Sequence, residues 1–239
     1  MTTESLHPKD GVLAGTINAT VATHPVDGYL ARPEGQQSYP AVVLIQEYWG
    51  IEPHIQQLTE RFAREGYVVL APDLYHGKVA QEPDEAVKMV MALNWAQASD
   101  EVSRAIDYLL AREDVSPKKI GVVGFCMGGL LTWKAAERED GRLAVIAPFY
   151  AGRYDPSAED MRKVTAPALV VWGGDDASIS AENRDKVTAL LEQEGKTHKA
   201  LTYPGAGHAF LNDKHDGYNA EAATQAYAEL VAWFAQYLQ

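Results

Sequence analysis

The sequence predicts an α/β domain with a mostly parallel central sheet covered by helices on both faces. Short apolar segments alternate with segments of helical periodicity along most of the 239 residues, and this alternation is typical of a parallel sheet. One apolar segment, residues 120–125, runs directly into a helical pattern through a turn bracketed by glycines. No internal repeat or long linker interrupts the pattern, so we expect a single domain over residues 1–239.

The first half of the chain predicts four strands and three helices. Residues 41–45 are apolar and rich in valine, which is the composition of a strand buried on both faces. The helical spacing of Ile55, Leu58 and Phe62 predicts a helix that ends near Gly66. The other elements expected here are strands at 11–20, 27–32 and 67–71 and helices at 84–96 and 100–112.

The second half continues the same alternation. The strand at 120–125 precedes a helix at 127–138, and a further helix is expected at 182–194. Apolar side chains at helical spacing predict a closing amphipathic helix that contains Tyr227, Leu230, Val231, Phe234 and Leu238. Three more strands are expected at 143–149, 168–172 and 199–203.

The composition limits the partners and the location of the protein. The chain carries 21 Lys and Arg against 33 Asp and Glu, a net charge of −12. Such a surface repels phosphate groups, so we expect neither nucleic acid nor a membrane as a partner. The polar N-terminus resembles no export signal, and a single cysteine cannot form an internal disulfide. We expect a cytoplasmic protein, and a monomer or small homo-oligomer.

That single cysteine, Cys126, occupies the centre of a nucleophile elbow, Gly124-Phe125-Cys126-Met127-Gly128. Gly124 and Gly128 allow a strand and a helix to approach closely while the residue between them adopts a strained backbone conformation. The unpaired N–H groups of a helix N-terminus favour a thiolate and an oxyanion. The alternative is a small buried thiol without chemistry, which is the usual state of a lone cysteine.

An acid and then a histidine follow the cysteine along the chain, which is the order found in α/β hydrolases. Asp176 follows the strand at 168–172, and His208 follows the strand at 199–203. Loops at the carboxyl ends of parallel strands converge, so these side chains can meet Cys126. The alternatives are a loop histidine with local hydrogen bonds and a solvated turn aspartate. For the neighbouring Asp175, the turn aspartate is the preferred interpretation.

A third acidic residue, Glu47, follows the strand at 41–45. In this fold that loop donates one backbone N–H to the oxyanion, and the residue after the nucleophile donates the other. The donors here would be Tyr48 and Met127. Glu47 would then lie beside the sulfur, where one of the two groups should hold a proton. The alternative is a surface glutamate.

No motif in the chain indicates a cofactor-binding site. Gly195-Lys196-Thr197 lacks the first glycine and the following helix of a phosphate-binding loop. The glycines near Cys126 do not form a dinucleotide fingerprint, and the histidines lack metal-ligand spacing. We therefore expect neither a cofactor nor a metal. Aromatic and polar residues near strand ends are candidates for contact with substrate, namely Trp49, Tyr75, His76, Tyr150 and Phe210.

With these residues in view, the sequence resembles the dienelactone hydrolase (carboxymethylenebutenolidase) family of the α/β-hydrolase superfamily. The resemblance implies that Cys126 is the nucleophile, His208 the base and Asp176 its orienting acid. It also implies that Glu47 keeps the resting thiol protonated and takes its proton when substrate binds. The motifs that carry it are Gln46-Glu47-Tyr48-Trp49-Gly50, Ala71-Pro72-Asp73-Leu74-Tyr75, Gly124-Phe125-Cys126-Met127-Gly128-Gly129 and Gly207-His208-Ala209-Phe210.

The chain departs from the family at two substrate-binding positions. Members that act on dienelactone carry two arginines that grip the substrate carboxylate; this chain has His76-Gly77-Lys78 and Asn212 there. Lysine does not copy the bidentate geometry of arginine. The sequence therefore predicts a hydrolase that cleaves a small ester or lactone through an acyl-cysteine intermediate. The alternatives are a broader carboxylesterase or thioesterase, and a non-catalytic thiol redox sensor on the same fold.

Overall fold

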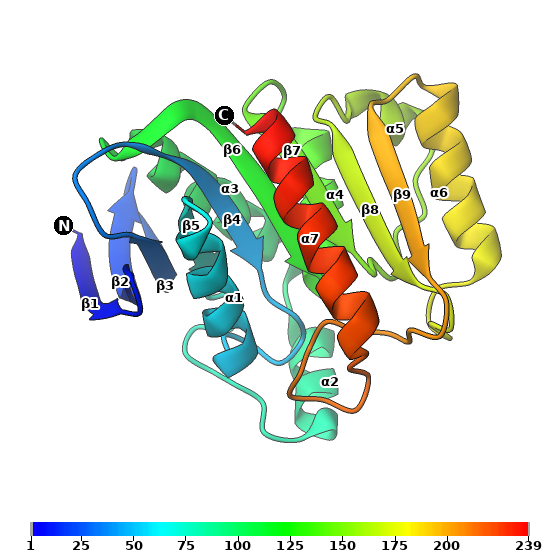
Figure 1. Cartoon of the computed structure of the whole chain (residues 1–239), viewed down its shortest axis with the longest axis horizontal. Coiled ribbons are helices and arrows are strands. Elements are labelled where there is room, and N and C mark those ends of the chain that lie inside the picture. Colours follow the sequence, from blue (N-terminus) through cyan, green and yellow to red (C-terminus); the bar gives the residue numbers. More distant parts are fainter. Residues whose placement is uncertain (1, 239) are drawn as a thin grey trace. The chain divides into compact units, whose positions relative to one another are not determined.

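The computed structural model describes residues 2–238 and divides the chain into two compact units, with the division between Gly121 and Val122. This division falls inside strand β6 (Val115–Phe125), whose first part belongs to one unit and whose end belongs to the other. Figure 1 shows the order of the helices and strands along the chain. The expectation of a single domain stays a prediction.

The first unit contains an antiparallel region followed by a parallel pair of strands. Its strands are ordered β1-β2-β3-β5-β4, followed by the first part of β6. Strands β1, β2 and β3 pair antiparallel in sequence order, β3 pairs antiparallel with β5, and β4 pairs parallel with β5. The bounds of these strands are β1 Thr3–Lys9, β2 Val12–Val21, β3 His24–Pro33, β4 Tyr39–Ile45 and β5 Val68–Pro72.

Strand β1 is an element that the sequence analysis missed. Six of its seven residues are exposed and none is buried, so it lacks the apolar alternation that identifies a strand in a sequence. Its register is set by pairing with β2, from Thr3 opposite Asn18 to Lys9 opposite Val12. Backbone hydrogen bonds to a neighbouring strand, rather than burial, hold β1 in place.

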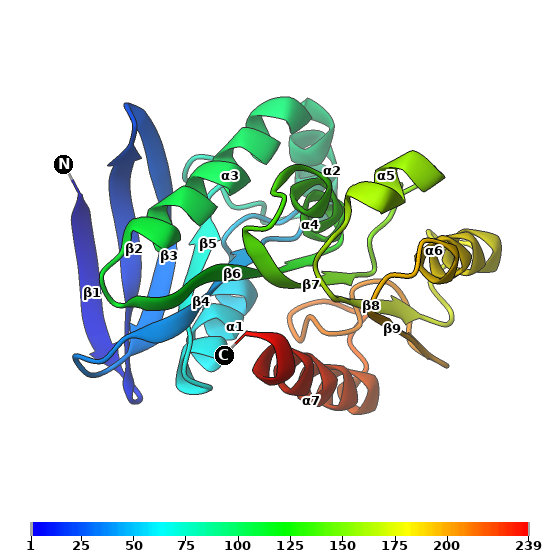
Figure 2. The same ribbon diagram turned by 90° about the horizontal axis from the view of Figure 1, so that it is seen from above.

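Helices α1 (Pro53–Arg64) and α3 (Trp95–Ala111) lie on opposite faces of the first unit's sheet, as the view in Figure 2 shows. Helix α1 buries Ile55, Leu58 and Phe62, as predicted. Helix α2 (Pro83–Ala92) and then α3 follow strand β5.

The break between α2 and α3 comes earlier than the sequence suggested. We expected helices at 84–96 and 100–112, but the chain leaves helical geometry at Leu93 and Asn94. The side chain of Asn94 accepts a hydrogen bond from Gln97 N at 3.2 Å and begins α3 as its N-cap. The sequence analysis overlooked this cap.

The second unit is a parallel sheet with helices on both sides. Strands β7, β8 and β9 pair parallel in that order, after the end of β6. Helix α7 lies on one face of these strands and α4 on the other (Figure 2). The short helix α5 was not predicted, because six residues are too few to show helical periodicity. The bounds are β7 Leu143–Phe149, β8 Ala168–Gly173, β9 His198–Tyr203, α4 Met127–Arg138, α5 Ala158–Lys163, α6 Ala181–Gln193 and α7 Ala220–Tyr237.

Within residues 2–238, no helix is both long enough and apolar enough to cross a membrane.

Candidate active site

Cys126 occupies the turn between strand β6 and helix α4. Its backbone has φ 56° and ψ −114°, a conformation that L-residues other than glycine rarely adopt. Backbone hydrogen bonds hold the turn: Cys126 N donates to Phe149 O at 3.1 Å, and Cys126 O accepts from Gly129 N at 3.0 Å. Backbone strain of this kind costs about 1–3 kcal/mol and is concentrated at functional sites. The side chain is half-buried.

The glycines of the elbow are required by space. A Cβ atom on Gly124 would lie 2.1 Å from Gly128 O and 2.5 Å from the Thr132 hydroxyl oxygen. A Cβ atom on Gly129 would lie 2.6 Å from Phe149 O. Helix α4 therefore lies too close to strand β6 for a side chain at Gly124, and too close to the end of β7 for one at Gly129.

His208 and Asp176 form a direct hydrogen bond. His208 Nδ1 lies 2.7 Å from Asp176 Oδ2. Asp176 comes from the loop after β8, and its side chain is fully buried, whereas the His208 side chain is 32% exposed. Asp175 is exposed and uses its backbone N–H to hold Ala206 O. Of the two neighbouring aspartates, Asp176 is the one that contacts His208.

The ionisation of this pair follows from its hydrogen bonds. Burial alone lowers the pKa of His208, but hydrogen bonds to Asp176 and to Cys126, with the charges on those two groups, raise it to about 10. Burial raises the pKa of Asp176, and hydrogen bonds from His208 and Ser178 outweigh this and lower it below its ordinary value. The geometry thus favours an ionised carboxylate beside a protonated imidazole, and the imidazole contacts the sulfur.

Two aromatic residues support the imidazole in the second unit. The ring of Tyr150 lies edge-on to that of His208, with 5.3 Å between centroids, and it also packs against Phe210. Both aromatic side chains are fully buried. Tyr150 and Ala209 have positive φ angles of 35° and 57°, so three non-glycine residues of this region carry backbone strain. Contact of Tyr150 and Phe210 with substrate stays a prediction.

The residues predicted from the loop after β4 lie in the first unit. Glu47 is 1% exposed, so it is not a surface glutamate. Gln46, also buried, accepts a hydrogen bond from Leu74 N at 3.2 Å and so links this loop to the loop after β5. Tyr48 and Trp49 stack edge-on with centroids 4.8 Å apart. The roles predicted for Glu47, Tyr48 and Trp49 stay predictions.

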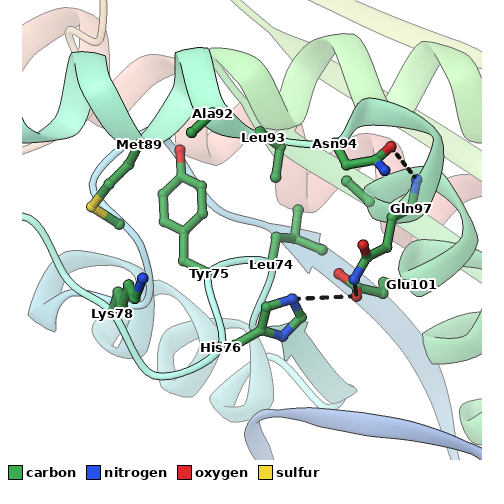
Figure 3. Close-up of a pocket in the computed structure, with 11 residues that line it drawn as sticks. Leu74, Tyr75, His76, Lys78, Met89, Ala92, Leu93, Asn94, Gln97 and Glu101 are labelled. Atoms are coloured by element: carbon green, nitrogen blue, oxygen red, sulfur yellow. Dashed lines mark hydrogen bonds and ion pairs between the residues drawn. The ribbon is translucent and has the colours of Figure 1, made fainter.

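A cavity of about 320 Å³ lies in the first unit, between the loop after β5 and helices α2 and α3. Figure 3 shows Tyr75 in its centre, with the hydroxyl group directed toward α2 near Ala92. His76 points the other way, with Nε2 3.5 Å from a carboxylate oxygen of Glu101 (Figure 3). The cavity is thus lined by two of the residues predicted to contact substrate, Tyr75 and His76.

One of the two positions where the resemblance implied an arginine holds a buried asparagine. Asn212 is fully buried, and its side-chain oxygen accepts a hydrogen bond from Lys214 N at 3.0 Å. The side chain of Asn212 thus helps to shape its own loop. Among residues 2–238, no group of three His, Cys, Asp or Glu side chains is placed to hold a metal ion.

The comparison with known families identifies the family of the chain. The sequence matches the dienelactone hydrolase family over residues 26–238. The chain belongs to the dienelactone hydrolase family. It is a hydrolase with the α/β-hydrolase fold, as the resemblance implied.

Relatives of the family cover nearly the whole chain. Protein usf of Aquifex pyrophilus is 34% identical, over 89% of this chain and 94% of its own length. A protein of Synechocystis sp. assigned as a carboxymethylenebutenolidase is 30% identical, over 91% of this chain and 96% of its own. A crystal structure of a protein from Klebsiella pneumoniae assigned as a dienelactone hydrolase superposes with a TM-score of 0.86 at 27% identity, over 95% of this chain and all of that one.

One residue in contact with Asp176 and His208 escaped the sequence analysis. Ser178 donates its hydroxyl to Asp176 Oδ1 at 2.6 Å, and its oxygen lies 3.1 Å from His208 Nδ1. The available signal was the Asp-x-Ser spacing, since an aspartate commonly bonds the backbone and side chain two residues ahead.

Proposed function

We propose that this protein cleaves a small carboxylic ester or lactone through an acyl-cysteine intermediate on Cys126, with His208 and Asp176 as its partners. The observation that supports this most is the continuous hydrogen-bonded series from Asp176 through His208 to Cys126 on a strained elbow. A nucleophile, a base and an acid that orients the base are the groups that acyl transfer requires.

Acylation begins with the imidazole and the sulfur. Nδ1 of His208 is bound to Asp176, which leaves Nε2 for the sulfur. His208 Nε2 holds the proton that the Cys126 thiol gives up, and the resulting thiolate attacks the carbonyl carbon. The carbonyl π bond breaks, and the oxygen takes its electron pair. We assign stabilisation of this oxyanion to the backbone N–H of Met127. The sequence analysis predicts the backbone N–H of Tyr48 as the second donor. Each donor contributes roughly 3 kcal/mol.

Collapse of the tetrahedral intermediate breaks the bond to the leaving oxygen, which takes the proton from His208 Nε2. The products of this step are an alcohol and an acyl-cysteine thioester. Neutral His208 then removes a proton from water as the water attacks the thioester. Expulsion of the thiolate releases the acid and leaves the proton on His208 Nε2 beside the free sulfur. No redox step and no further reactant is needed.

The substrate is small and does not depend on a bidentate carboxylate clamp. Neither of the two carboxylate-binding arginines is present, because the chain has His76-Gly77-Lys78 in place of one and Asn212 in place of the other; we therefore expect neutral esters and lactones to be better substrates than dienelactone.

Hydrolysis of p-nitrophenyl acetate tests the proposal. Cys126→Ala is expected to lower kcat/KM by several orders of magnitude, because loss of one member of a catalytic triad removes most of the acceleration. Circular dichroism of the variant checks that the fold is kept. A variant that keeps more than about a tenth of the wild-type kcat/KM would show that another nucleophile acts.

A further inference from the structure

Ser178 contacts both partners of the hydrogen bond that orients the imidazole. Its hydroxyl group donates to Asp176 Oδ1 at 2.6 Å, while the same oxygen lies 3.1 Å from His208 Nδ1. Asp176 Oδ1 also accepts from Ser178 N at 2.9 Å. The other carboxylate oxygen, Oδ2, is bound to His208. Oδ1 of the Asp176 carboxylate therefore accepts from Ser178, and Oδ2 is bound to His208.

The hydroxyl group is in position to fix the plane of the carboxylate. A carboxylate rotates readily about the bond to its methylene group, because that torsion is broad. Two donors on Oδ1 restrict the rotation and direct Oδ2 at His208. Since the hydroxyl donates its only proton to Asp176, its lone pair faces His208 Nδ1 as a second acceptor for that N–H.

This hydroxyl group is not required for the turn itself. Ser178 N donates to Asp176 Oδ1 at 2.9 Å and Ile179 N donates to Asp176 O at 3.3 Å, and these two bonds hold the turn without it. Ser180, two residues later, differs: its hydroxyl accepts from Asn183 N at 3.2 Å and caps helix α6. Within residues 2–238, Ser178 is not the N-cap of a helix, and its side chain is bonded to Asp176 and His208.

We propose that Ser178 is a positioning residue of the reaction, whose hydroxyl group holds the Asp176 carboxylate toward His208 Nδ1 and shares the same N–H. This inference rests on the proposed function, because it assigns to Ser178 an action through Asp176 and His208. Ser178 makes no contact with substrate in this role. Its effect is therefore on turnover, while the affinity for a neutral ester is unchanged.

Three variants test the proposal with p-nitrophenyl acetate. Ser178→Ala is expected to lower kcat on the order of tenfold with KM nearly unchanged, because it removes one hydrogen bond to a charged group. Ser178→Thr keeps the hydroxyl group and is expected to restore kcat to within about twofold of wild type. Ser180→Ala is the matched control: it loosens the same loop at the helix cap but leaves the hydroxyl on Asp176 in place.

Proton NMR gives a readout that a purely structural role would not move. The Nδ1 proton of His208, held between Asp176 and Ser178, should give a low-field resonance, assigned by its absence in His208→Gln. In Ser178→Ala this resonance is expected to shift and to broaden through faster exchange with water. In Ser178→Thr and Ser180→Ala it should stay at the wild-type position.

The inference fails if Ser178→Ala keeps both the wild-type kcat and the wild-type Nδ1 resonance. It also fails if Ser180→Ala loses as much activity as Ser178→Ala, since loosening of the loop would then explain both, or if Ser178→Thr does not restore kcat. In each of these cases, complete loss of activity in Cys126→Ala leaves the proposed function standing. Activity retained in Cys126→Ala would overturn the proposed function and this inference together.

Discussion

His208 Nδ1 lies 2.7 Å from Asp176 Oδ2, although 32 residues separate the two in the sequence. The carboxylate is fully buried, and the imidazole is about one-third exposed. This difference suits the proposed roles, because the acid is shielded from water while the base can meet both substrate and water. The ends of the parallel strands β8 and β9 bring the two loops together.

Replacing Asp176 with asparagine should remove the orienting charge with little change in shape. An amide can donate as well as accept, so it allows the wrong tautomer of His208. We expect kcat for p-nitrophenyl acetate to fall by about two to four orders of magnitude. Asp175→Asn is the matched control, because Asp175 is exposed and its backbone N–H donates to Ala206 O. Equal activity of Asp176→Asn and wild type would contradict the assignment.

The raised pKa of His208 predicts how stability depends on pH. The pKa rises from 6.5 to about 10 on folding, so the native state holds this proton more tightly than the unfolded state. The resulting stabilisation is complete below pH 6.5 and is lost as the pH rises toward 10. Urea unfolding should therefore show a larger gap in stability between wild type and Asp176→Asn at pH 6 than at pH 9. A gap that grows with pH would contradict the ion pair.

Gly124→Ala tests the close approach within the elbow. The added methyl group would meet Gly128 O at 2.1 Å, which is backbone and cannot rotate away. We expect a loss of stability of about 1–3 kcal/mol or more, together with loss of activity. Gly152→Ala is the control, since nothing lies within 4 Å of the added atom there. Urea unfolding of the two variants measures the difference, and equal stability would show that the elbow is looser than described.

The role of Glu47 is a sequence-based prediction that thiol labelling can test. If this buried carboxylate exchanges a proton with the sulfur, Glu47→Gln should change the rate at which iodoacetamide labels Cys126 across the pH range. Glu60→Gln is a control from the same unit, because Glu60 is also buried but is bound to Tyr29 and Lys9. Equal labelling rates in wild type and Glu47→Gln would rule out gating of the thiolate.

The sequence predicted the parts of the fold that burial dictates. Strand β8 is buried along its whole length and β4 at every residue except Pro40, so their apolar runs were visible without a structure. Strand β1 and helix α5 were missed because neither buries an apolar stripe long enough to recognise. The boundary between α2 and α3 depended on the cap at Asn94, a local hydrogen bond rather than a pattern.

The candidate site was predictable to a similar extent. The order of Cys126, Asp176 and His208 along the chain was sufficient to name all three, because topology brings such loops together. Ser178 could not be assigned, since an aspartate and a serine in a turn usually serve only the turn. Its significance lies in the 3.1 Å distance to His208 Nδ1, which sequence spacing does not supply.

The most direct test of the central claim is mass spectrometry of the intact protein during turnover of a slowly released ester, followed by peptide mapping. The account predicts an acyl group on the peptide that contains Cys126, formed in wild type and absent in Cys126→Ala. An acyl group on any other residue, or steady hydrolysis by a protein with no acyl adduct under conditions that trap one, would contradict it.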